Sequence, residues 1–163
     1  MADDFLDDPP VEQPQPVEQK TAYDWASSAP VIQSGELVSN PLLNELQIDI
    51  DEPSQYAVFE DCMAILKRET PGQLIRVLET PSKSGKYGHV HIRVLLPWTV
   101  TPWERIAWQA ALGSDSRREL LSCLRARAGN VQPTRLVESD AIAKQVDDWY
   151  HEVYPVRGGN TVQ

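Results

Sequence analysis

Two aspartates and two histidines lie at alternate positions in two short segments of the chain. The first pair is Asp49 and Asp51, and the second pair is His89 and His91. Carboxylate oxygens at this spacing suit Mg²⁺ or Mn²⁺, and imidazole nitrogens also bind Mn²⁺ or Zn²⁺. If the two segments lie side by side, these four catalytic candidates form a divalent-metal or phosphate site, with Asp49 and Asp51 as the metal ligands.

Groups that bind phosphate lie close to the histidines in the sequence. The loop at 82–88 contains two Gly, two Ser and two Lys, although its sequence is not that of a P-loop. Such a loop offers backbone N–H groups and ammonium charges to a phosphate. The candidate phosphate-binding residues are Lys83, Ser84, Lys86 and Arg93.

Hydropathy alternates with period two around both pairs, which is typical of half-buried strands. In 46–51 the acids fall at odd positions, and in 89–94 the histidines and Arg93 fall at odd positions. Apolar residues occupy the even positions of both segments. Because successive side chains of a strand point to opposite faces, the polar sets of two neighbouring strands share one face.

Other segments supply the elements that must bring these strands together. A capping box at Thr101 to Glu104, with Pro102 at the first helical position, predicts a helix start. Further patterns predict helices at 54–68, 102–112, 116–128 and from residue 140, and strands at 74–80 and 133–138. The order β-α-β-β-αα-β-α begins with a split βαβ unit. We therefore predict an α+β, ferredoxin-like or RRM-like fold with an antiparallel sheet, a doubled second crossover helix, helices on one face and an open polar face.

Charge is distributed unevenly along the chain. Residues 1–45 hold nine acidic side chains and one Lys, whereas the rest holds fifteen acidic and fourteen basic side chains. We expect a disordered acidic, Pro- and Gln-rich tail at 1–42, an RRM-like domain at 43–156 and a flexible C-terminus at 157–163. We expect no signal peptide, and no apolar run approaches the roughly 18 residues of a membrane span. These features predict a cytoplasmic protein without a membrane partner.

Two other surfaces have alternative interpretations. Acidic residues flank aromatic ones at Phe5 and at Tyr23 to Trp25, so the tail either docks on a protein partner or only keeps the chain soluble. Four arginines lie on the predicted helix at 116–128, and we interpret them as a solvated face, with contact to nucleic acid as the alternative. They are Arg117, Arg118, Arg125 and Arg127.

The Asp and His segments resemble the catalytic core of the archaeo-eukaryotic primase superfamily over about residues 46–138. That family has an Asp-x-Asp at a strand end, a helix, a strand, a Ser-Gly-rich loop and a strand bearing His. The counterparts here are Ile48-Asp49-Ile50-Asp51, the helix at 54–68 and Thr80-Pro81-Ser82-Lys83-Ser84-Gly85-Lys86-Tyr87-Gly88-His89-Val90-His91. The resemblance implies an RRM-like fold and a DNA-replication enzyme of the primase type, a metal-dependent nucleotidyltransferase.

The resemblance also implies roles for single residues. Asp49 and Asp51 would bind Mg²⁺ or Mn²⁺, and either His89 or His91 would contact the phosphates of a nucleotide. Lys83, Lys86 and Arg93 would neutralise phosphate charge. The family's third acid has no clean match, and its nearest candidates are Glu138 and Asp140. A reduced member that only binds nucleotides or nucleic acid is therefore an alternative to a working enzyme.

Two further functions remain open. The triplet His89-Val90-His91 also resembles the metal-binding histidines of HUH endonucleases, the single-strand nucleases that initiate rolling-circle replication. Tyr150 or Tyr154, four residues apart on the last helix, would then supply the nucleophile. The other alternative is a non-enzymatic adaptor or inhibitor of a replication or defence protein. A phage or plasmid gene product suits all of these functions.

Overall fold

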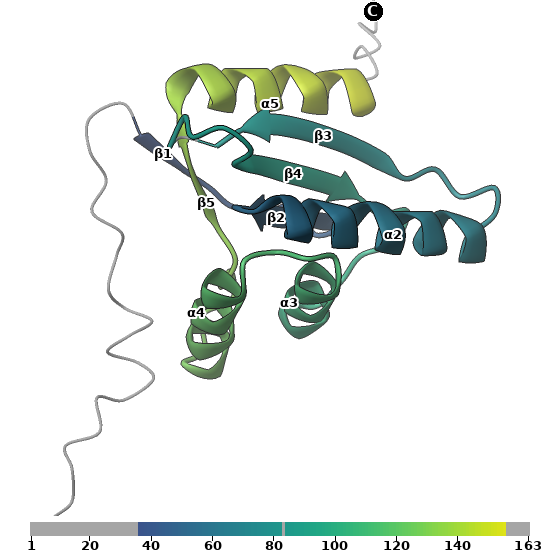
Figure 1. Cartoon of the computed structure of the whole chain (residues 1–163), viewed down its shortest axis with the longest axis horizontal. Helices are drawn as coiled ribbons and strands as arrows, with labels where there is room; N and C mark the ends of the chain where they lie inside the picture. Colours follow the sequence, from purple (N-terminus) through teal and green to yellow (C-terminus); the bar gives the residue numbers. More distant parts are fainter. Residues whose placement is uncertain (1–35, 83, 156–163) are drawn as a thin grey trace, which may run out of the picture.

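The computed structural model describes residues 36–82 and 84–155, which form the predicted α+β fold (Figure 1). No helix within these ranges is long and apolar enough to cross a bilayer. The elements in chain order are β1 (Glu36–Ser39), β2 (Glu45–Ile50), α2 (Pro53–Glu69), β3 (Arg76–Pro81), β4 (Val90–Leu95), α3 (Pro102–Ala111), α4 (Ser116–Arg127), β5 (Leu136–Ser139) and α5 (Asp140–Val153).

The strands form two antiparallel sheets. The larger has the order β2-β4-β3, so the Asp-bearing and His-bearing strands are neighbours, as predicted. The smaller sheet pairs β1 with β5. The last predicted strand therefore joins a partner near the N-terminus instead of adding to the three-stranded sheet, although the order of elements agrees with the ferredoxin-like prediction.

Strand β1 corrects the expected domain boundary. Residues 36–39 fall inside the tail predicted at 1–42, yet they pair with β5 from Glu36 opposite Ser139 to Ser39 opposite Leu136. A strand of four residues is too short to show a clear alternation of polar and apolar residues. Its partner β5 lies about a hundred positions away, so no hairpin pattern indicates the pairing either. The predictions for residues 1–35 and 157–163 lie outside the described part of the chain.

Helix α2 covers the apolar face of the larger sheet. Its buried residues Phe59, Met63 and Leu66 recur at helical spacing and pack against the even-numbered side chains of β2 and β4. Each such side chain that leaves water stabilises the fold by roughly 1.5–3 kcal/mol. The members of this core from the two strands are Leu46, Ile48, Ile50, Ile92 and Val94.

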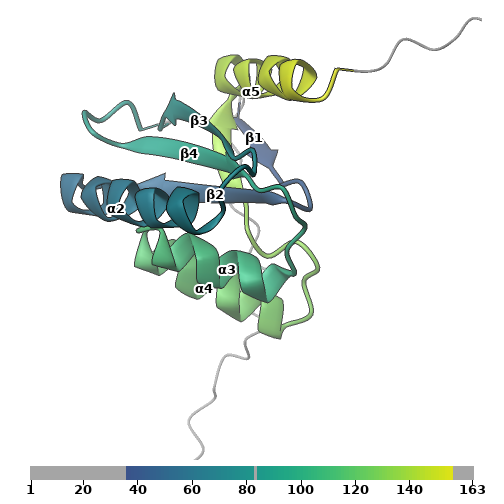
Figure 2. The same cartoon turned by 90° about the vertical axis from the view of Figure 1, so that its right-hand side faces the viewer.

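Helices α3 and α4 lie along the free edge of β2, beside this core (Figures 1 and 2). Their side chains bond the outward backbone groups of that strand. Arg105 donates to the Glu45 carbonyl at 2.8 Å, and Arg118 donates to the Gln47 carbonyl at 2.6 Å. The Gln109 side-chain oxygen accepts from the Gln47 N–H at 2.9 Å. The doubled crossover thus protects an edge that would otherwise offer unpaired backbone groups to another strand.

The junction between α3 and α4 requires a glycine. Gly113 has φ +84°, and a Cβ atom there would lie 2.6 Å from the carbonyl oxygen of Gln55. Only glycine combines this left-handed conformation with so close a backbone approach. The predicted end of the helix at 102–112 is therefore confirmed, and the turn at Gly113 places Ser114 and Asp115 against Asp49.

The polar face of the larger sheet is covered, so the expectation of an open face is wrong. Figure 2 shows α2 on one side of this sheet and β1 and β5 on the other. Helix α5 contacts β1, β3 and β5, and its Tyr150 hydroxyl donates to the Glu45 carboxylate. The covered side chains Glu45, Gln47 and Arg93 are fully buried. Helices therefore lie on the apolar face, along the β2 edge and beside the polar face.

Candidate phosphate-binding site

The four residues singled out by their spacing form two cross-strand pairs. Asp49 is the direct partner of His91 in the β2–β4 register, and Asp49 Oδ1 lies 3.6 Å from His91 Nε2. Asp51 Oδ1 lies 2.6 Å from His89 Nδ1, just beyond the ladder. The prediction that both pairs share one face is confirmed, because each carboxylate faces an imidazole of the neighbouring strand.

Glu138 extends the inner pair from the other sheet. Its Oε1 atom lies 3.5 Å from His91 Nδ1 and 2.7 Å from Arg93 Nη2. Strand β5 supplies this carboxylate, which is only 1% exposed. Of the two sequence candidates for a third acid, Glu138 thus lies beside the site, whereas Asp140, at the start of α5, is exposed.

Arg93 is buried in an ion-pair network, where it cannot play its predicted phosphate-binding role. The side chain is 0% exposed, and its Nε atom lies 3.2 Å from Glu45 Oε1 while Nη2 contacts Glu138. A guanidinium between two buried carboxylates compensates their charge, and both acids would be strongly unfavourable without it. A phosphate in solvent cannot reach Arg93 in this conformation, so this prediction is corrected.

Burial favours a higher pKa for all three acids of this network, but their partners oppose this to different extents. It raises the pKa of Asp49, although the charges of His91 and Arg118 oppose the shift. It also raises the pKa of Glu45. For Glu138, burial alone would raise the pKa, but the hydrogen bonds and charges of His91 and Arg93 together lower it. Glu138 is therefore the acid held most firmly as a carboxylate.

A pocket of about 380 Å³ opens beside the inner Asp–His pair. Asp49 and His91 line it from β2 and β4, and the serines of the β3–β4 loop line another part. Guanidinium groups from α4 and from the segment before β5 complete the polar lining. The full lining is Asp49, Ser82, Ser84, His91, Arg118, Arg135, Leu136 and Val137.

Two arginines of this pocket were not among the predicted site residues. Arg118 was interpreted as part of a solvated helix face, but it is only 9% exposed and reaches the Gln47 carbonyl. Arg135 precedes β5 and had no sequence signal beyond its charge. Only the packing of α4 against the β2 edge could identify Arg118, because a helical pattern does not say what the helix meets.

The loop between β3 and β4 brings some of its predicted groups to the pocket. It is closed by the Ser82 N–H, which donates to the His89 carbonyl at 3.0 Å, and by a 3.3 Å contact between the Ser82 and Ser84 hydroxyls. Ser84 lines the pocket, as its predicted role requires. Lys86 is exposed and is not part of the lining. Lys83 lies outside the described residues.

Asp49, His91 and Glu138 do not surround one metal-binding point, and metal binding by Asp49 and Asp51 stays a prediction. Within the described ranges, no group of three or more His, Cys, Asp or Glu side chains is placed to hold one. The reason lies in His91, whose Nε2 faces Asp49 and whose Nδ1 faces Glu138, so its two carboxylate neighbours lie on different sides of the ring. Ligands of one ion must converge on a single point, and these three groups do not.

The tyrosines expected for an HUH nuclease are not brought to the histidines. The Tyr150 hydroxyl donates to Glu45, and burial together with that carboxylate raises its pKa. Glu45 precedes Asp49 by four residues, or roughly 13 Å along a strand. The Tyr154 hydroxyl accepts from Asn44 at 3.0 Å, near the same end of β2. Neither phenol is placed to attack a phosphate held beside His91.

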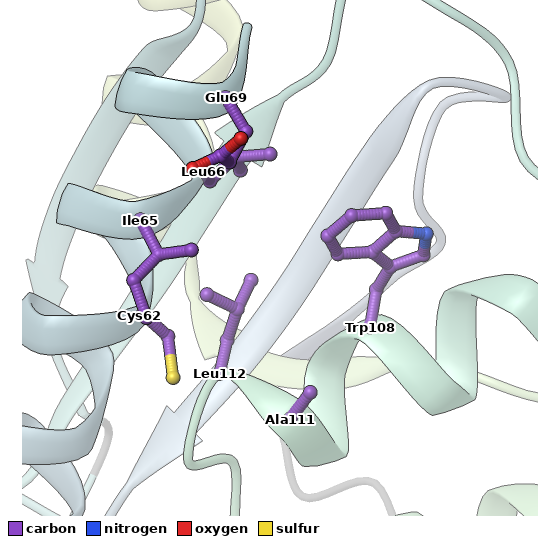
Figure 3. A pocket seen from close by; sticks show the side chains of 7 residues that line it. All are labelled: Cys62, Ile65, Leu66, Glu69, Trp108, Ala111 and Leu112. Atoms are coloured by element: carbon purple, nitrogen blue, oxygen red, sulfur yellow. The ribbon is translucent and has the colours of Figure 1, made fainter.

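A second pocket, of about 240 Å³, lies between α2 and α3 (Figure 3). Its lining is apolar except for Glu69 and the Cys62 thiol. Trp108 stands across from Glu69 at one end, and Cys62 and Leu112 lie toward the other end (Figure 3). This pocket contains no pair of groups that could bind phosphate or transfer a proton, so it is not part of the polar site.

Comparison with known proteins gives no match from which a function could be assigned, so the argument for a function depends on the residues of the site. No protein-family model matches the chain, and neither a curated protein nor a solved structure matches it. The resemblance to the primase superfamily therefore stays a prediction from the sequence.

Proposed function

We propose that this chain is a nucleic-acid or nucleotide-binding protein of the replication type, and that it binds a phosphate group in the pocket beside Asp49 and His91. The observation that carries the proposal is the lining of this pocket, where two guanidinium groups and two hydroxyls meet. Guanidinium is the side-chain group best matched to phosphate, and hydroxyls add neutral donors.

The charges around the pocket favour an anion. Arg118 is bound to Glu119, with Nη1 2.6 Å from Oε1, whereas Arg135 forms no ion pair with any residue of 37–82 or 84–155. Burial raises the pKa of Asp49, and the charges of His91 and Arg118 oppose this shift. An incoming phosphate would therefore meet at least one guanidinium that has no carboxylate partner among the described residues.

Binding without catalysis is the version that the geometry supports best. Primase-type nucleotidyl transfer with Mg²⁺ or Mn²⁺ at Asp49 and Asp51 is the second candidate, favoured by the position of both acids on one face. It would require the carboxylates to turn from their imidazole partners toward a common point. Extension of a primed template with labelled nucleotides and Mn²⁺, lost in Asp49→Ala, would support this candidate.

Calorimetric titration of the full chain with adenosine monophosphate tests the binding proposal. Arg135→Gln should weaken binding about ten- to a hundredfold, because one charge-assisted hydrogen bond contributes roughly 1.5–3 kcal/mol. Arg76→Gln is the matched control, since it removes the same charge from an exposed position on β3 that does not line the pocket. No binding by the wild type, or equal losses in both variants, would overturn the proposal.

A non-enzymatic adaptor that binds a replication or defence protein through its acidic tail remains compatible with this pocket. It would differ in one measurement, because its partner complex would survive Arg135→Gln. The same substitution would weaken a complex that depends on nucleic acid.

A further inference from the structure

Three guanidinium groups meet where α4 packs on the segment that leads into β5. Arg118 and Arg125 are seven residues apart on α4 and therefore lie on one face of it. Both donate to the backbone of that segment, Arg118 to the Arg135 carbonyl and Arg125 to the Pro133 carbonyl, each at 3.4 Å. Arg135 brings the third guanidinium from the segment itself.

The part of the chain that the structure describes offers little negative charge to balance this cluster. Among the described residues only Arg118 has a carboxylate partner, Glu119, while Arg125 and Arg135 have none. The Nε atoms of all three arginines are buried without a hydrogen-bond partner. Buried and half-buried cations in folded proteins are normally paired, so an unbalanced cluster indicates a site for an external anion.

The electrostatic environment of Arg125 agrees with this reading. Burial, together with the positive charges of Arg135 and Arg118, lowers the pKa of the Arg125 guanidinium. The guanidinium stays charged at neutral pH, because its usual pKa lies far above that range. The repulsion therefore remains until a negative group neutralises it.

One phosphate in the pocket would leave this repulsion partly in place. The pocket lining includes Arg118 and Arg135 but not Arg125. We propose that Arg125 forms a second phosphate subsite beside the pocket, so that the ligand carries at least two linked phosphate groups. The inference rests on the proposed phosphate-binding function and adds the class of ligand, a polyphosphate or a phosphodiester chain.

Titrations of the full chain with inorganic phosphate, pyrophosphate and a short single-stranded oligonucleotide test the second subsite. Wild type should bind pyrophosphate or the oligonucleotide at least tenfold more tightly than phosphate. An advantage for pyrophosphate indicates a nucleoside polyphosphate, and an advantage for the oligonucleotide alone indicates a nucleic-acid backbone. Either result supports two linked phosphates.

Arg125→Gln should remove this advantage and leave the affinity for inorganic phosphate within about twofold. Arg127→Gln is the matched control, because it removes the same charge from an exposed position on α4. If Arg125→Gln does not fold, Arg125→Lys keeps the charge but loses the planar fork, and it should weaken only the ligands with linked phosphates.

The two proposals fail in different ways. A wild type that binds phosphate but gains nothing from a second linked phosphate overturns the second subsite alone. The same holds if Arg125→Gln weakens phosphate and pyrophosphate by the same factor, or weakens neither. A wild type that binds none of the three ligands overturns the phosphate-binding function and the second subsite together.

Discussion

Asp49 and His91 are direct partners in an antiparallel ladder, and Asp49 Oδ1 lies 3.6 Å from His91 Nε2. The other ring nitrogen of His91 faces Glu138 of the second sheet. This carboxylate–imidazole–carboxylate line joins the rim of the pocket to the buried charges beneath it. The pocket and the core of the polar face are therefore one electrostatic unit, and each part of it can be tested.

Removing the buried guanidinium of Arg93 should strongly destabilise the fold. Arg93→Met leaves Glu45 and Glu138 buried without their cation, so we expect a loss of about 3–5 kcal/mol in the free energy of unfolding. Urea denaturation followed by circular dichroism measures it.

Arg68→Met is the control for this prediction. Arg68 forms an exposed ion pair with Glu69, so its loss should cost less than about 1 kcal/mol. Similar losses in the two variants would contradict the role assigned to Arg93.

Asp49 and Glu138 should respond to pH with opposite signs. The folded pKa of Asp49 lies above its usual 3.8, so its contribution to stability is full below that value and is lost as pH rises through the folded pKa. Asp49→Asn avoids this loss, and its stability relative to wild type should improve as pH rises from about 3.5 to 6.

For Glu138 the folded pKa lies below its usual 4.5, so its contribution is full above 4.5 and is lost as pH falls. Glu138→Gln should therefore become less stable relative to wild type as pH rises through the same window. Urea denaturation of both variants and wild type at several pH values checks the signs. Two trends in the same direction would contradict the environments described for these acids.

Tyr150 should prove to be structural instead of catalytic. Its hydroxyl donates to the buried Glu45 carboxylate, so Tyr150→Phe should destabilise the fold by about 1–3 kcal/mol. Tyr154→Phe, at an exposed hydroxyl, should cost less than about 1 kcal/mol. Incubation of the wild type with single-stranded DNA and Mn²⁺ should leave no covalent adduct on a denaturing gel. An adduct that Tyr150→Phe or Tyr154→Phe removes would revive the HUH hypothesis.

Phosphate binding should not depend on a divalent metal. Because His91 separates the carboxylates of Asp49 and Glu138, we expect a chelator to leave the affinity for adenosine monophosphate unchanged within about twofold. Titration with Mn²⁺ alone should release no heat beyond dilution. A one-site Mn²⁺ isotherm that Asp49→Ala abolishes would instead support the primase-type candidate.

Local sequence patterns predicted most of the elements. The capping box at Thr101 forms as expected, with both reciprocal hydrogen bonds, and the Ser139 hydroxyl caps α5 by accepting from the Ile142 N–H. Such signals act within four residues, so they operate wherever the rest of the chain lies. Strand β1 escaped prediction because its pattern is short and its partner β5 is distant in the sequence.

The candidate site was only partly predictable for the same reason. Alternation placed Asp49 and His91 on one face of two strands, and the register confirms it. Arg118 and Arg135 reach the pocket through packing between elements, which no single segment records. The prediction for Arg93 was wrong in the other direction. Its charge indicated a group that binds phosphate from solvent, whereas its partners are the buried carboxylates of Glu45 and Glu138.

The sequence by itself determined which side chains share a face, because a period of two is a property of the extended backbone. Only the tertiary structure decided what that face meets. A polar strand face can be satisfied by water or by charges from distant elements, and its own sequence is the same in both cases. Here Glu138 and Tyr150 cover Arg93 and Glu45, so most of the polar strip is core. The open end beside Asp49 is where a ligand can still enter.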